Sequence, residues 1–120
     1  MGLFSLFRRL TPSASRRATV TFDDESVTCR RSNGKSETVR WSDLRAVLIQ
    51  TTDAGPFVDD VFWVLAGERS GCVVPSEADG MDRLLERLQR LPNFDNRAVI
   101  DAMASTDNRE FVCWKRERVA

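Results

Sequence analysis

The sequence of 120 residues contains no histidine, and this absence excludes several common active sites. Without histidine, neither a Ser-His-Asp triad nor a Cys-His pair can form. The usual general base at neutral pH and the commonest metal-binding side chain are missing as well. The sequence also lacks the phosphate-binding signatures GxGxxG and GxxxxGK[ST] and the nucleophile signature GxSxG. Carboxylate pairs are therefore the only familiar catalytic groups that the chain offers.

Cysteine is scarce, and long apolar runs are absent. The three cysteines, Cys29, Cys72 and Cys113, are too far apart for a CxxC metal motif and cannot all pair. We interpret them as reduced, buried thiols of a cytoplasmic protein, with a Cys29–Cys113 disulfide as the alternative. No run approaches the roughly 18 apolar residues of a transmembrane helix. The first ten residues do not form a secretory signal, because their arginines follow the apolar residues.

The chain has no excess of either charge. It carries 18 basic and 18 acidic side chains, which argues against a nucleic-acid partner. A hydrophobic fraction of 42% and a charged fraction of 30% are typical of a globular protein. This length favours one domain. We place that domain at residues 18–116, after a head and linker at residues 1–17 and before a tail at residues 117–120. We expect no cofactor.

Residues 3–10 have the pattern of a short amphipathic helix followed by a polar linker. One face carries Leu3, Leu6, Phe7 and Leu10, and two arginines lie beside it. This head either docks on the protein's own body or lies on a membrane surface or a partner. The candidate contact residues are Leu3, Phe4, Leu6 and Phe7.

Alternating apolar residues predict a strand-rich middle of the chain. The expected strands cover residues 19–22, 27–31, 39–41, 44–51, 61–66 and 72–74, and a last strand covers residues 111–115. In this last strand both faces are apolar, which predicts a central or well-covered position in the sheet.

The loop length of the hairpin around residues 32–34 can be predicted from which residues it would pair across the two strands. A two-residue Asn33-Gly34 loop would place Val27 on the opposite face from Val39. A three-residue loop that ends at Gly34 places Val27 beside Val39, so that one apolar face results. Because register follows the buried face, we expect the longer loop, with Gly34 in the left-handed region.

Two helices follow the first six strands. Leucines at helical spacing predict a helix that begins with a capping-box variant at residues 76–79 and is ended by Pro92. A second short helix begins at Asp95, with Phe94 and Val99 at the positions of a hydrophobic staple. This order predicts an α+β fold. We expect an antiparallel, strongly bent sheet or partial barrel of about six strands, then two helices and a final strand.

The longest loop, residues 52–60, contains the candidate site residues Asp53, Phe57, Asp59 and Asp60. Three interpretations remain open: a structural loop, a recognition loop with an exposed Phe57, or a site where the carboxylates bind a divalent cation. The tryptophans, Trp41, Trp63 and Trp114, are core anchors or form an aromatic site.

The stretch from Val39 to Val47, VRWSDLRAV, resembles the strand–turn–strand passage "W-x-D-L/I-x-x-V" of bacterial PH-like domains. That resemblance implies a strand barrel capped by a helix, although here two helices precede a last strand. Residues 40–115 also resemble a set of small bacterial proteins without an assigned activity. This second likeness is carried by residues 41–44, 55–56, 60–63, 71–75, 88–92, 94–96 and 111–114.

These observations favour a non-enzymatic, cytoplasmic protein-binding domain whose partner is an unidentified protein. One alternative is an enzyme that uses a divalent metal held by the carboxylates of the acidic loop. The other is a peripheral membrane-associated protein anchored by residues 3–10.

Overall fold

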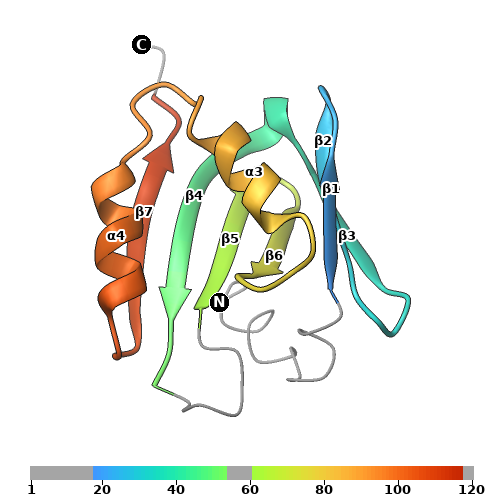
Figure 1. The fold of residues 1–120 in the computed structure, drawn as a ribbon. Coiled ribbons are helices and arrows are strands. Elements are labelled where there is room, and N and C mark those ends of the chain that lie inside the picture. The colour runs from blue at the N-terminus through green and yellow to red at the C-terminus, as the bar shows by residue number, and fades with distance from the viewer. Residues whose placement is uncertain (1–17, 54–60, 118–120) are drawn as a thin grey trace.

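The computed structural model describes residues 18–53 and 61–117 (Figure 1). The described chain confirms the α+β class, with seven strands in two antiparallel sheets and two α-helices. The first sheet has the strand order β1-β2-β3, and the second has the order β6-β5-β4-β7. The described strands do not close into a barrel. The predicted head, with Leu3, Phe4, Leu6 and Phe7, lies outside the described residues.

The elements follow one another along the chain in the order that Figure 1 labels. They are β1 (Thr19–Phe22), β2 (Ser26–Arg30), β3 (Ser36–Arg40), the 3-10 helix η1 (Trp41–Asp43), β4 (Leu44–Thr51), β5 (Val61–Gly67), β6 (Gly71–Pro75), α3 (Met81–Leu88), α4 (Asn96–Ala104) and β7 (Arg109–Lys115).

The hairpin between β2 and β3 confirms the predicted loop length. Val27 pairs with Val39, and Cys29 pairs with Glu37. Gly34 has a φ of 88°, in the left-handed region that glycine adopts without strain. Burial of one apolar face has therefore set the register of this hairpin.

The expected strand at residues 39–41 ends one residue early. β3 stops at Arg40, and Trp41 begins the η1 turn that leads the chain from the first sheet into the second. The half-buried Trp41 ring packs edge-on against Phe22 with a centroid distance of 6.4 Å. Its indole N–H donates to the Asp23 carbonyl at 2.8 Å, so the ring closes the corner between the sheets.

The second sheet carries the core on one face. β4 lies between β5 and β7, and Figure 1 shows both helices on the same side of this sheet. Trp63 is 1% exposed and belongs to a buried cluster that also contains residues of the first sheet and both helices. Trp114 is buried too, and its indole N–H donates to the Pro92 carbonyl at 2.9 Å. Trp63 and Trp114 are therefore core anchors, as predicted.

The prediction of a central or well-covered last strand is wrong, because β7 lies at the edge of its sheet. Val47 pairs with Trp114 and Leu48 pairs with Val112, so Cys113 has no partner on β4. This β-bulge turns Cys113 and Trp114 both into the core. The run of apolar residues therefore reflects a bulge and not a strand with neighbours on both sides.

The capping-box prediction for the first helix is also wrong. α3 begins at Met81 after Gly80, which has a φ of 92°, and the helix has no side-chain cap. The helix ends at Leu88, and a turn with a Leu91 N–H to Leu88 carbonyl bond leads to Pro92. α4 begins as expected, because the Asp95 carboxylate caps it by accepting from the Ala98 N–H at 3.1 Å.

Candidate functional site

The acidic loop of the sequence analysis is described only at its start. Phe57, Asp59 and Asp60 lie in residues 54–60, outside the described residues. Asp53 is described, and its carboxylate accepts a 3.1 Å hydrogen bond from the Asn108 side chain. The Asn108 side chain in turn accepts from the Asp53 N–H at 3.2 Å. Asp53 is thus fastened to the turn before β7. Within residues 18–53 and 61–117, no three potential metal-ligating side chains gather.

A buried hydroxyl holds the same turn against the end of β4. Thr51 is fully buried, and its hydroxyl donates to the Asp107 carbonyl at 2.6 Å. The Gln50 side chain donates to the Arg109 carbonyl at 3.0 Å, where β7 starts. These bonds position the first residues of β7.

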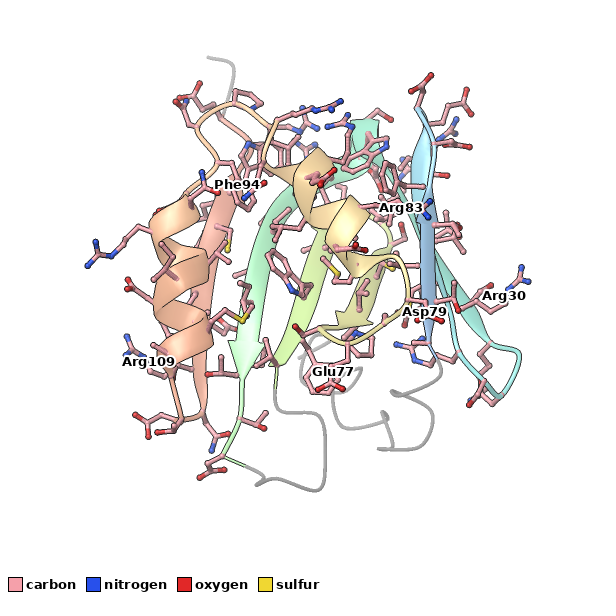
Figure 2. All side chains as sticks on the ribbon, viewed as in Figure 1. Arg30, Glu77, Asp79, Arg83, Phe94 and Arg109 are labelled. Atoms are coloured by element: carbon pink, nitrogen blue, oxygen red, sulfur yellow. The ribbon has the colours of Figure 1, made fainter. Side chains whose placement is uncertain are left out.

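A shallow depression of about 370 Å³ lies beside this turn, between the end of α4 and the start of β7. The Arg109 guanidinium lies over the Phe111 ring, 4.8 Å from its centroid, and Figure 2 shows Arg109 near the start of β7, beside α4. The depression is open and mixes acidic, basic and hydroxyl groups. Its lining is Asp101, Ala104, Ser105, Thr106, Asp107, Arg109 and Phe111.

The edges of the sheets differ in what covers them. β3 and β6 end their sheets and lie against each other. The Val73 N–H of β6 donates to the Glu37 carboxylate at 3.0 Å, and the Val73 carbonyl accepts from Arg31 at 3.2 Å. Arg31 and Glu37 also form a largely buried ion pair of 3.2 Å. The two side chains thus occupy backbone groups of β6 that a further strand would pair.

The outer edge of β1 is covered by the segment before α3. The Val20 N–H donates to the Asp79 carbonyl at 2.8 Å, and the Asp79 N–H donates to the Ala18 carbonyl at 3.0 Å. Figure 2 shows Asp79 beside β1. Gly80 is needed here, because a Cβ atom on it would meet the Val20 carbonyl oxygen at 2.3 Å.

Among the described residues, no strand pairs with the outer edge of β7, although α4 packs along this strand. Asp95 covers a single group of this strand, since its N–H donates to the Cys113 carbonyl at 2.7 Å. Val112, on the face that points away from the helices, is 43% exposed. The strand therefore combines unpaired backbone groups with an exposed apolar side chain, which is the combination that invites pairing with another chain.

α4 carries a second set of exposed apolar side chains. Ile100 is 63% exposed and Met103 is 48% exposed, and their spacing of three residues places them on one flank of the helix. With Val112, they are the large apolar side chains that the described chain exposes.

Trp41 does not form an open aromatic site. The Arg87 guanidinium lies over its ring at 4.3 Å, and Arg116 donates to its carbonyl at 2.9 Å. Arg87 belongs to α3 and Arg116 directly follows β7, so two distant parts of the chain brace the corner of the two sheets.

The local surroundings of Asp23 and Cys113 shift their pKa values in opposite directions. The pKa of the Asp23 carboxyl is lowered because its side chain accepts hydrogen bonds from the Glu25 and Ser26 N–H groups. Burial raises the pKa of the Cys113 thiol to about 12. An elevated pKa keeps Cys113 a thiol at neutral pH, and a thiol is a poor nucleophile.

The open edge of β7 was missed by the sequence analysis, which treated the strand as covered. A signal was present in the charged residues that flank its apolar centre, namely Arg109, Glu110 and Lys115. Charged side chains of this kind are frequent on edge strands. The roles of Arg31 and Glu37 had no comparable signal, because the contacts join strands distant in the chain.

Comparison of the chain with protein-family models, curated proteins and solved structures finds no match. Neither described helix is long and apolar enough to cross a membrane. The candidate site is therefore defined by the geometry of the described residues, and its centre is the edge of β7.

Proposed function

We propose that this protein is a non-enzymatic domain that binds another protein by accepting an extended segment of it at the edge of β7. One observation carries the proposal: in the described chain β1 and β6 have edge backbone groups bonded by other segments and β3 lies against β6, whereas on the outer side of β7 only the Cys113 carbonyl is covered, by Asp95. Proteins commonly protect such edges, and an unprotected one is a template for strand addition.

The partner segment would gain most of its affinity from main-chain hydrogen bonds to β7. Its side chains would alternate between the two faces of the extended sheet. On the face away from the helices, an apolar side chain would lie beside Val112 and remove it from water. Glu110 and Lys115 would select opposite charges near the two ends of the segment.

The sequence resemblance and the three thiols bear on the family and the cellular compartment of the protein. The stretch Val39–Val47, which carries the resemblance to PH-like domains, folds as the end of β3, η1 and the start of β4. The position of β7 after both helices is the departure from the PH-like pattern. Free thiols at Cys29, Cys72 and Cys113 support a reducing compartment, the bacterial cytoplasm.

The test uses a random-peptide library displayed on phage and selected against the immobilised full chain. We expect the selected peptides to alternate apolar and polar residues. The best peptide is then synthesised in two forms, one unmodified and one N-methylated at every second residue. N-methylation removes the amide hydrogens needed for pairing, so it should abolish binding in an isothermal titration.

Two chain variants with the same chemical change locate the contact. Val112→Lys should weaken binding about tenfold or more, because it places a charge beside an apolar partner side chain. Ile100→Lys makes an equivalent change on α4 and should leave the affinity unaltered. Failure to select any peptide, or equal binding by Val112→Lys and the wild type, would contradict the proposal. If only Ile100→Lys lost affinity for the peptide, the contact would lie on α4 instead.

A further inference from the structure

Two of the three cysteines lie together between the sheets. Cys29 on β2 pairs in register with Glu37 on β3, and the Cys72 thiol on β6 lies 3.7 Å from the Glu37 carbonyl oxygen. Strands β2 and β6 are in contact, and both sulfur-bearing side chains are fully buried in the same core cluster. The disulfide considered in the sequence analysis paired Cys29 with Cys113, whereas the fold places Cys29 beside Cys72.

The two thiols differ in their chemistry because of their mutual contact. The pKa of Cys29 is lowered, chiefly because the Cys72 thiol donates a hydrogen bond to it and also because Arg31 lies nearby. The same contact and burial raise the pKa of Cys72. Cys29 is thus the more acidic of the two thiols and Cys72 the less acidic, which is the division of roles that a reactive dithiol needs.

We propose that Cys29 and Cys72 are a dithiol oxidation site that a peroxide converts into a disulfide between the two sheets. This site is separate from β7 and independent of the function proposed above. The oxidation is reversible, because a dithiol reductant restores both thiols.

The oxidation balances in two steps. The Cys29 thiolate attacks a peroxide oxygen, the O–O bond breaks, and a sulfenic acid forms on Cys29 while hydroxide leaves and takes a proton to become water. The Cys72 sulfur then attacks the Cys29 sulfur, the S–O bond breaks, and the hydroxyl group leaves with the Cys72 proton as a second water. The two sulfur atoms lose two electrons together, and the peroxide accepts them.

The Arg31–Glu37 ion pair determines how fast a peroxide reaches these sulfur atoms. Both side chains bind the backbone of Val73, the residue after Cys72, and hold β6 against the first sheet. Oxidation therefore requires a transient separation of β6 from this pair. Glu37→Ala should accelerate disulfide formation several-fold without changing which cysteines are joined.

The test treats the full chain with hydrogen peroxide, alkylates free thiols after denaturation, and maps the products by mass spectrometry. Before alkylation, we expect the intact mass of the oxidised protein to be lower than that of the reduced protein by about 2 Da, the loss of two hydrogens when a disulfide forms. A peptide linked through Cys29 and Cys72 should appear, with alkylation only at Cys113. The oxidised protein should melt at a higher temperature than the reduced protein, and dithiothreitol should reverse both changes.

Single alanine variants provide the controls. Cys72→Ala should lose the mass decrease, and the matched variant Cys113→Ala should keep it. Retention of all three thiols in the wild type, or a disulfide that includes Cys113, would overturn the proposal. Mapping the disulfide in the wild-type protein tests the proposal even if a cysteine variant fails to fold.

Discussion

The backbone N–H of Val73 on β6 donates a 3.0 Å hydrogen bond to the carboxylate of Glu37 on β3, and this bond joins the edges of the two sheets. Arg31 completes the arrangement by binding both the Glu37 carboxylate and the Val73 carbonyl at 3.2 Å. The Arg31 and Glu37 side chains thereby bind the Val73 N–H and carbonyl groups, which a neighbouring strand would bind in a continuous sheet. The first six strands are held together at this point without a continuous ladder.

Removal of the Glu37 carboxylate should destabilise the fold markedly. Glu37→Ala leaves the Val73 N–H and the Arg31 guanidinium without their partner in a largely buried place. We expect a loss of about 2–3 kcal/mol in the free energy of unfolding, measured by urea denaturation. Glu37→Gln should lose less, because its amide oxygen can still accept from the Val73 N–H.

The exposed ion pair between Arg45 and Glu68 is the matched control. Its side chains are 52% and 53% exposed, so Glu68→Ala should change the free energy of unfolding by less than about 1 kcal/mol. If Glu37→Ala and Glu68→Ala lowered the free energy of unfolding equally, the contact of Glu37 with Val73 would add no stability beyond that of an exposed ion pair.

Two glycines with similar backbone angles should respond differently to alanine. Gly80→Ala forces a Cβ atom toward the Val20 carbonyl oxygen and adds the strain of a left-handed alanine. Gly34→Ala adds only that strain, since no atom lies within 4 Å of its Cβ position. We expect Gly80→Ala to lower the free energy of unfolding by about 1–3 kcal/mol more than Gly34→Ala does, measured by thermal or urea unfolding. A similar loss in both variants would mean that β1 does not lie against residue 80.

Asp23 should contribute to the acid sensitivity of the protein. Its pKa is lower in the folded chain than the ordinary value of 3.8, chiefly because of the hydrogen bond from the Glu25 N–H. The stabilisation is therefore fully present above that ordinary value and is lost as the pH falls through the folded pKa. Asp23→Asn should be less stable than the wild type at neutral pH, and the difference should shrink in acid. A difference that grows below pH 3.8 would contradict this assignment.

Local patterns predicted those parts of the fold that depend on neighbouring residues. The register of β2 and β3 follows from burial of Val27 and Val39 on one face, and Asp95 caps α4 through a bond to a residue three positions away. The α+β class follows in the same way from the order of strand and helix periods.

Features that depend on distant contacts were not predictable in this way. Trp41 leaves β3 because the chain must pass from one sheet to the other, and Cys113 is buried by a bulge opposite β4. Asp79 forms backbone bonds with Ala18 and Val20 instead of completing a capping box with Ser76. The candidate site shares this origin, since the open edge of β7 is known only once the neighbours of every other edge are known.

Hydrogen–deuterium exchange of the full chain, with and without the library-selected peptide, tests the central claim most directly. The account predicts that the amides of residues 109–112 become protected when the peptide binds, while the amides of α4 keep their exchange rates. Protection confined to α4 or to any other segment, with β7 unchanged, would contradict strand addition at this edge.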